Sequence, residues 1–301
     1  MHLPIIFIHK NDNLYLPYIF AQAKISNPDS KVFLLGDKRN SYYKFINHDH
    51  IDNYMAKSGE FAKIYKHMNT NPYDYEIFCL QRWFVLKEFM EKNNIQQCFH
   101  ADSDVMIYSD ITQVYNKYFM KYDMSMTYSC GHCCYISSID AITNFCNFII
   151  ELYTDPKLFK ILEDIYLEHT QNNMLGGVSD MVAFEEYRKR NSDRLGNLSD
   201  ILDNSAFDTN LNISEGYEMR NGLKNIYLKN NQPYCRYNCD NREIKFNAVH
   251  FQGSLIKKYI KRNFTGNIIK LSYYLLLNIL NNNLFKELER FARSQRKKIF
   301  K

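Results

Sequence analysis

Residues 98–107 have the sequence CFHADSDVMI, in which Asp102 and Asp104 separate two apolar runs. A short apolar run bounded by polar residues is typical of a buried strand. We therefore expect a strand that ends at Ala101, with a second apolar segment, residues 105–107, directly behind the aspartates. In extended backbone, residues i and i+2 project to the same face. The two carboxylates should accordingly lie side by side at the carboxyl end of the strand.

Two adjacent carboxylates repel each other unless a cation lies between them. Their hard oxygen atoms suit Mg²⁺ or Mn²⁺, whose remaining positions are filled by water and substrate phosphates. Such a metal stabilises a departing diphosphate as a Lewis acid. An Asp-x-Asp triplet is by itself equally compatible with a surface turn or a helix cap, so its position after a buried strand is what favours the metal.

The chain before this stretch alternates strands and helices. The apolar run at residues 3–9 predicts a strand, the helical spacing over 14–25 predicts a helix, and residues 31–35 predict a second strand. Strand, helix and strand in so short a segment form a βαβ unit, which implies a parallel sheet with a right-handed crossover. A longer helix predicted over residues 76–93 leads into the stretch 98–107.

The chain after this stretch continues the same pattern. We expect strands at 124–128, 133–136 and 244–251, and helices at 139–153, 158–169 and 179–190. Residues 191–240 are rich in Asn and Asp and weakly periodic, which indicates loops with short elements, and beyond Gly253 the pattern is helical. Ligands of α/β sheets bind at the carboxyl ends of strands. The segments after His9, Ala101 and Phe251 are therefore the expected site.

The composition excludes several classes of protein. The chain has 301 residues, a net charge of +5 and 46% hydrophobic residues, as in a globular protein with a substantial core. This charge is too small for a typical nucleic-acid-binding domain. The 10 glycines include no G-x-G and no Gly-Lys pair, which excludes the Gly-rich loops that hold phosphates by backbone N–H groups. A nucleotide would need another phosphate ligand, and a bound metal is the obvious substitute.

Residues 98–107 resemble the metal-binding strand of GT-A-fold glycosyltransferases, and further motifs occur in the order found in these enzymes. An arginine, Arg82, lies on the preceding helix. The sequence SCGH at 129–132 resembles the small-residue turn after the next strand, and GGVSD at 176–180 resembles the acidic start of an acceptor-side helix. The sequence HFQG at 250–253 with a following lysine, Lys257 or Lys258, is similar to the late signature of glycosyltransferase family 8.

The resemblance, which covers about residues 1–258, implies an α/β fold of GT-A type, a Rossmann-like, mixed and mainly parallel sheet flanked by helices. It would occupy residues 1–253, with a nucleotide-sugar-binding half at about 1–110 and an acceptor-side half at about 111–253. The implied activity is a hexosyltransferase-type transfer, dependent on Mn²⁺ or Mg²⁺, from a nucleoside-diphosphate sugar to a hydroxyl of a glycan or lipid-linked acceptor, as in polysaccharide biosynthesis. The alternatives are a sugar nucleotidyltransferase and a non-catalytic sugar-binding or membrane-scaffolding protein.

The same resemblance assigns roles to individual residues. The metal ligands would be Asp102, Asp104 and His250, and the catalytic residue would be Asp180. The residues implied to bind the nucleotide sugar are His9, Asn11, Asp12, Tyr15, Arg82, Asp102, Ser103, Gly253 and Lys257. Some have structural alternatives: His250 as a hydrogen-bonded core histidine, the lysines as a solvated basic face, and the Asn and Asp residues after the first strand as a helix cap.

Arg82 and Asp180 each have two interpretations. A guanidinium on an otherwise apolar helix needs a partner, either the aspartate pair or a donor phosphate, or else a structural carboxylate such as Glu76. Asp180 would be the general base of an inverting transferase, or a hydrogen-bond partner of the donor sugar in a retaining one. Alternatively, it is a first-turn aspartate favoured by the helix dipole next to the capping residue Ser179.

The cysteines allow a zinc site as an alternative metal centre. Cys130 and Cys133 have ligand spacing, whereas Cys235 and Cys239 are more loosely spaced and distant. The first residues lack the basic start and long apolar run of a secretory signal. We therefore expect a reducing compartment in which the 8 cysteines are thiols.

The last part of the chain differs in charge from the rest. Residues 254–301 contain 12 Lys or Arg and two Glu, a net charge of +10, which leaves −5 for residues 1–253. The apolar segment 268–280 is shorter than the roughly 20 residues that a membrane span requires. An amphipathic helical tail on an anionic membrane surface is expected, with a helix packed on the domain as the alternative. The predicted location is cytoplasmic, with peripheral association at the inner face of a membrane and no nucleic-acid partner.

Overall fold

The computed structural model describes residues 2–273, 275 and 276. The predicted tail therefore falls mostly outside the described residues, including the basic cluster between Arg290 and Lys298 and the end of the apolar segment 268–280.

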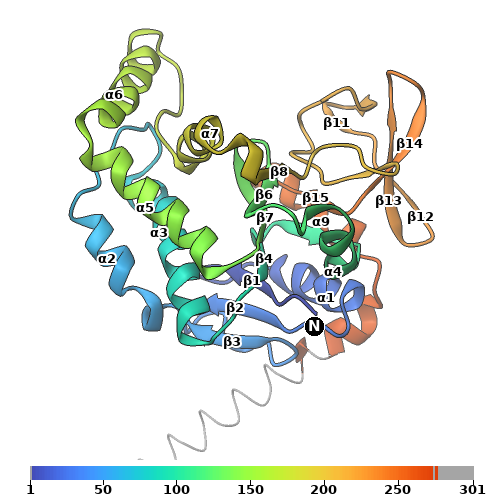
Figure 1. The fold of residues 1–301 in the computed structure, drawn as a ribbon. Coiled ribbons are helices and arrows are strands. Elements are labelled where there is room, and N and C mark those ends of the chain that lie inside the picture. The colour runs from blue at the N-terminus through green and yellow to red at the C-terminus, as the bar shows by residue number, and fades with distance from the viewer. Residues whose placement is uncertain (1, 274, 277–301) are drawn as a thin grey trace, which may run out of the picture.

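A seven-stranded sheet with the strand order β3-β2-β1-β4-β7-β6-β8 forms the centre of the molecule (Figure 1). Its strands are β1 (Ile5–Ile8), β2 (Val32–Gly36), β3 (Asn47–His50), β4 (Cys98–Ala101), β6 (Met124–Thr127), β7 (Cys130–Ile136) and β8 (Leu195–Asn197). Four neighbouring pairs are parallel, and only the pairs β4–β7 and β6–β7 are antiparallel. The prediction of an α/β fold with a mixed, mainly parallel sheet is confirmed.

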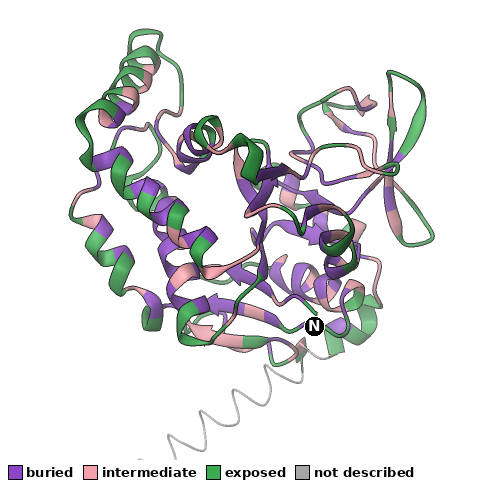
Figure 2. Ribbon diagram, viewed as in Figure 1, coloured by how far each residue is buried: buried purple, intermediate pink, exposed green. Residues whose placement is uncertain are grey.

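Helices cover both faces of this sheet, because successive residues of a buried strand point to opposite sides. Ile5 and Phe7 of β1 belong to one hydrophobic cluster, while Ile6 and Ile8 belong to the other. The first cluster takes in side chains from α1 (Leu16–Ser26), α4 (Ile111–Val114), α8 (Ser254–Lys257) and α9 (Ile260–Asn263). The second takes in α2 (Ala56–Ala62), α3 (Tyr73–Lys92), α5 (Ile139–Thr154), α6 (Pro156–Gln171) and α7 (Asp180–Arg190). Figure 2 shows the strands buried between these layers.

The strands outside the central sheet lie mainly between residues 205 and 250 and form three smaller sheets. The largest has the order β12-β13-β14-β9, with β9 (Ser205–Ala206), β12 (Tyr227–Lys229), β13 (Gln232–Tyr237) and β14 (Arg242–Phe246). The other two pair β10 (Met219–Arg220) with β11 (Leu223–Lys224), and β15 (Ala248–His250) with β5 (Val105–Ile107). The sequence indicated only loops with short elements for most of this region.

The single strand expected at residues 244–251 is two strands in different sheets, and Asn247 separates them. Its N–H donates to Ala206 (2.8 Å), and its carbonyl accepts from Tyr108 (2.8 Å) and Ser109 (3.2 Å). The chain thus changes partner from β9 to β5 at this residue. A continuous apolar run cannot show such a change, because both halves are buried.

The first part of the predicted basic tail packs on the rest of the molecule. Ile256, Ile260, Phe264 and Leu271 are buried and belong to the same cluster as β1 and α1. In the described part of the chain, no helix has the length and apolar character that crossing a membrane requires.

We predict that Gly131→Ala destabilises the fold. A Cβ at Gly131 would lie 2.4 Å from Trp83 and 2.5 Å from Phe184, which pack directly on β7. Relieving this overlap in a close-packed core costs about 1–3 kcal/mol, and urea denaturation measures it. Gly59→Ala in α2 is the matched control, since nothing lies within 4 Å of its Cβ position. Equal stability of the two variants would contradict the packing argument.

Candidate active site

The aspartate pair lies in a tight turn between β4 and β5. The N–H of Asp102 donates to the His132 carbonyl on β7 (2.8 Å), and the N–H of Val105 donates to the Asp102 carbonyl (3.0 Å). The N–H of Phe251 donates to the Asp104 carbonyl (3.0 Å), and His250 pairs with Val105 in the β15–β5 ladder. This register places His250 next to Asp104, although 146 positions along the chain separate them.

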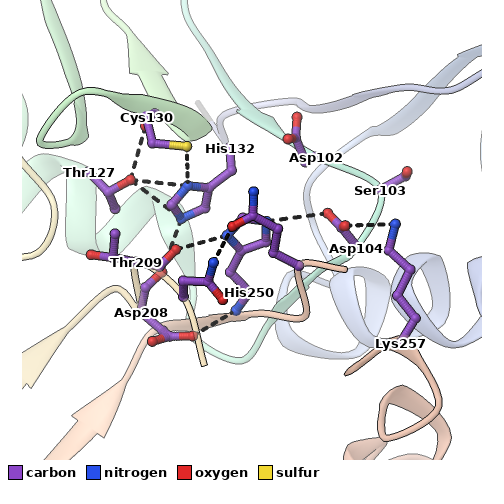
Figure 3. A network of polar contacts seen from close by, with 12 residues as sticks. Asp102, Ser103, Asp104, Thr127, Cys130, His132, Asp208, Thr209, His250 and Lys257 are labelled. Carbon is purple, nitrogen blue, oxygen red and sulfur yellow. Dashed lines mark hydrogen bonds and ion pairs between the residues drawn. The ribbon is translucent and has the colours of Figure 1, made fainter. Parts of the chain in front are cut away.

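Asp102, Asp104 and His250 each offer a ligand atom, and these atoms all lie within 4.8 Å of one another. The Nδ1 of His250 faces the Thr209 carbonyl (2.8 Å), which can only accept, so Nδ1 carries the proton of the neutral ring. Its Nε2 then presents a lone pair 3.6 Å from Asp104 Oδ1. Figure 3 shows His250 between Asp104 and Thr209. An imidazole lone pair and two carboxylates form a donor set that fits a divalent cation.

The charges around the pair keep both carboxylates ionised. Burial acts to raise the pKa of Asp102, but the Arg82 guanidinium and His100 hold it well below its usual range. Burial acts in the same direction on Asp104, and His250 outweighs it, so the pKa of Asp104 is lowered. Burial would lower the pKa of His250, whereas the Asp104 carboxylate raises it above its ordinary value. The site therefore attracts positive charge.

Arg82 joins two carboxylates from distant parts of the chain. Its guanidinium pairs with Asp102 and, through Nη2, with Asp180 Oδ2 (2.7 Å). Glu76, the structural alternative from the sequence, accepts instead from Asn71 (2.6 Å). The partner of Arg82 is thus one member of the aspartate pair, and Asp180 is brought to the same site.

Asp180 is the first residue of α7, and the Ser179 side chain caps this helix by accepting from Met181 N (3.3 Å). The local features expected from the helix dipole are therefore present. In addition, Asp180 Oδ2 faces the Trp83 indole N–H (3.4 Å) as well as Arg82, and only 9% of the side chain is exposed. Asp180 is therefore connected to the candidate metal ligand Asp102 through Arg82.

Lys257, rather than Lys258, lies at the aspartate pair. Its Nζ is 3.0 Å from Asp104 Oδ2, while Nζ of Lys258 lies over the Tyr259 ring at 5.1 Å. Gly253 precedes α8 with φ +92°, a conformation that favours glycine, and its carbonyl accepts from Lys257 N (3.2 Å). The short helix α8 thus turns Lys257 back toward Asp104.

The residues expected to seat the nucleoside divide into two groups. His9 Nδ1 is hydrogen-bonded to Ser103 Oγ (2.7 Å), which connects the first strand to the aspartate turn. Asn11 has φ +75°, and its N–H donates to Asp37 (2.8 Å), so this part of the loop has a structural role.

The second group surrounds a cavity of about 460 Å³. The lining residues are Asp12, Asn13, Leu14, Tyr15, Pro17, Tyr18, Tyr42, Tyr43, Lys257, Lys258, Lys261 and Leu275. Asp12 accepts from the hydroxyls of Tyr42 and Tyr43 (2.6 Å for Tyr43), and Lys257 lies 5.3 Å from the Tyr15 ring centroid. The sequence did not indicate the two tyrosines, since no motif surrounds them.

A second layer of residues supports His250, and sequence reasoning missed most of it. The His132 ring stacks on His250 with centroids 4.0 Å apart, and its Nε2 donates to the Asp208 carbonyl (3.0 Å). The Asp208 carboxylate accepts from His250 N (3.1 Å) and pairs with Lys224 (2.6 Å), whose side chain is fully buried. Lys224 also pairs with Glu215 (2.6 Å). The only available signal was a lysine without an apparent role in an Asn- and Asp-rich region.

The zinc alternative has no support in the described residues. All eight cysteines are free thiols, as expected. Cys130 Sγ lies 3.1 Å from His132 Nδ1 as part of the buried layer. Among the residues that the structure describes, Asp102, Asp104 and His250 are the only group of three or more His, Cys, Asp or Glu side chains placed for a metal.

Comparison with known proteins gave matches only among solved structures. No family model and no curated protein matches the chain. The structure is similar to mouse xyloside xylosyltransferase 1 in its apo form (TM-score 0.46, 9% identity, 68% of this chain and 87% of that chain). It is also similar to the bifunctional glycosyltransferase WbbM (0.47, 8%, 91% and 51%). A third similar structure is the galactosyltransferase LgtC with donor and acceptor sugar analogs (0.43, 9%, 90% and 100%).

We predict that His132 makes stability depend on pH. Burial lowers the pKa of His132 from its ordinary 6.5 to about 3. Between these values the unfolded chain binds the proton and the folded chain does not, so stability falls as the pH drops through this window. The slope is up to about 1.4 kcal/mol per pH unit. His132→Gln should flatten the curve in urea denaturation between about pH 4.5 and 7, whereas His2→Gln, at a half-exposed histidine, should not. Parallel curves for all three proteins would exclude this role.

Proposed function

We propose that this chain is a GT-A-type glycosyltransferase that transfers a sugar from a nucleoside-diphosphate donor to a hydroxyl of a glycan or lipid-linked acceptor. The observation that carries the proposal is the convergence of Asp102, Asp104 and His250 within 4.8 Å at strand ends, with Lys257 at 3.0 Å from Asp104. A diphosphate is a substrate group that suits such a combination of metal ligands and an ammonium.

Asp102, Asp104 and His250 would hold Mn²⁺ or Mg²⁺, which when bound supplies Lewis-acid stabilisation of the diphosphate leaving group. Lys257 contributes a further positive charge on the side of Asp104 that faces Tyr15. The adjoining cavity of about 460 Å³ has an aromatic wall for a base and lysines for phosphates. We assign the nucleoside to this cavity.

Asp180 and Arg82 define the side of the metal site that faces the reacting sugar. Because Arg82 pairs with both Asp102 and Asp180, it orients Asp180 relative to the metal ligands. Asp180 Oδ2 already faces two donors, Arg82 and Trp83. This arrangement supports hydrogen bonding to the donor sugar more than proton abstraction from the acceptor, and therefore retention. NMR of the anomeric proton of the product distinguishes retention from inversion. Inversion would instead support Asp180 as the general base.

We propose further that the protein is cytoplasmic and binds the inner face of a membrane through its basic tail. Residues 254–301 carry a net charge of +10, and the last described part of the chain packs on the core. Because of this packing, a tail bound to the membrane would stay close to the catalytic domain. A lipid-linked acceptor in the membrane would then lie near the active site.

We predict that Asp104→Asn abolishes sugar transfer and leaves the fold intact. The amide retains the shape of the side chain but removes the anionic metal ligand, so Mn²⁺ should no longer raise the melting temperature in the presence of nucleotide sugars. Release of free sugar and nucleoside diphosphate, without acceptor, measures donor turnover. Release of pyrophosphate would instead indicate the nucleotidyltransferase.

The matched control is Asp240→Asn, because Asp240 is exposed, pairs with Arg242 and is not a member of the candidate metal group. It should retain wild-type turnover and the response to Mn²⁺. Near-normal turnover in Asp104→Asn would refute the metal role, and absence of turnover and donor binding in the wild type would favour the non-catalytic alternative.

We predict that neutralising the end of the tail weakens membrane binding. A full-length variant with Arg290→Gln, Arg293→Gln, Arg296→Gln, Lys297→Gln and Lys298→Gln should float less with vesicles containing anionic phospholipid. Each basic residue near such a surface contributes about 1 kcal/mol, so the loss should exceed tenfold. Neutral vesicles are the control. Equal flotation of wild type and variant with anionic vesicles would exclude these basic residues as the membrane-binding part of the chain.

A further inference from the structure

A second cavity lies on the face of β15 away from the metal ligands. Its volume is about 510 Å³, and it includes Val249 and Phe251, the neighbours of His250. Side chains alternate along a strand, so His250 points to Asp104 while its neighbours point into this cavity. The other lining residues are Leu211, Arg220, Asn221, Leu223, Lys224, Asn225, Ile226, Tyr227, Tyr259, Arg262 and Asn263.

The lining of this cavity is cationic and contains no carboxylate. Arg220 and Arg262 have no ion-pair or side-chain hydrogen-bond partner within the described residues, in contrast to Arg39, Arg82, Arg194 and Arg242, which each pair with an aspartate. Lys224 also lines the cavity, but Asp208 and Glu215 neutralise it. Two uncompensated guanidinium groups therefore face one concave surface.

A hairpin and a short helix carry these arginines. Arg220 ends β10 at a two-residue hairpin turn in which Asn221 (φ +53°) and Gly222 (φ +77°) both adopt positive φ. The N–H of Lys224 donates to the Leu211 carbonyl (2.7 Å) and ties this hairpin to the neighbouring segment. On the opposite wall, the Arg262 guanidinium carbon lies 5.2 Å from the Tyr259 ring centroid.

The donors and surfaces of the cavity match an anionic sugar. Guanidinium groups bind carboxylate and phosphate oxygens through paired hydrogen bonds. The Asn221 amide suits sugar hydroxyls, and so do the side-chain oxygens of Asn225 and Asn263, whose Nδ2 atoms donate to Glu218 and to the Tyr259 carbonyl. The rings of Tyr227 and Tyr259 suit the apolar face of a pyranose. An apolar peptide or a neutral lipid chain would leave both arginines unpaired.

We propose that this cavity binds a sugar bearing a carboxylate or phosphate, belonging to the acceptor chain. The assignment to the acceptor rests on the proposed function, because the donor is assigned to the opposite face of β15. The cavity would then select acidic acceptor glycans by binding a sugar unit other than the one that carries the reacting hydroxyl.

The test compares wild type with the double variant Arg220→Gln, Arg262→Gln by calorimetric titration. The probes are oligosaccharides that end in glucuronate, in a phosphorylated glucose or in unmodified glucose, at one ionic strength. Wild type should bind at least one acidic probe at least tenfold more tightly than the neutral one, and the double variant should lose this preference. The control is Arg236→Gln, since Arg236 is exposed on β13 outside the cavity.

Donor hydrolysis by the same proteins separates this proposal from the proposed function. The double variant should hydrolyse donor like wild type, because neither arginine belongs to the metal site. Failure of wild type to prefer either acidic probe, or an equal preference in the double variant, would overturn the cavity assignment even if donor hydrolysis persists. Preference for an acidic probe without donor turnover would refute the transferase while leaving an anionic sugar site.

Discussion

The repulsion between two carboxylates held together at the end of a buried strand governs the arrangement of this protein. Asp102 and Asp104 are largely shielded from water, and four cationic or imidazole side chains surround them: Arg82, His100, His250 and Lys257. These side chains come from α3, β4, β15 and α8. Together these side chains outweigh the effect of burial on the pKa values of the two carboxylates. These charges thus connect α3, β15 and α8 to the turn after β4.

Strand β15 is the element on which these connections meet. Its pairing with β5 sets His250 beside Asp104, and the backbone of His250 is held by Asp208, which pairs with Lys224, a side chain that also pairs with Glu215. A buried ionic group of this kind stabilises little by itself, because desolvation offsets the attraction. Its effect here is to fix positions. Asp208 and Lys224 orient His250, and Lys224 also lines the second cavity.

Much of the fold could be predicted because its strands are short apolar runs and its helices have helical spacing. The βαβ unit, the helix α3 and the stretch around Asp102 all follow from local patterns. The small sheets between residues 205 and 250 could not be predicted in this way. Strand β3, with the sequence NHDH, is held by pairing with its neighbour β2 rather than by an apolar face. Similarly, the change of partner at Asn247 depends on strands that are remote in sequence.

By itself, the sequence determined the α/β class and the set of candidate ligands, because alternation and spacing act over a few residues. The two aspartates lie close together in a tight turn, and not in the extended backbone from which the sequence predicted their proximity. Only the tertiary structure decided which partners these residues have. It placed Lys257 rather than Lys258 at Asp104 and paired Arg82 with both Asp102 and Asp180. It also paired Lys224 with Asp208, the residue that accepts from the His250 N–H. The physical reason is that charge neutralisation and strand register act through space, between segments up to about 150 residues apart, and no local pattern records them.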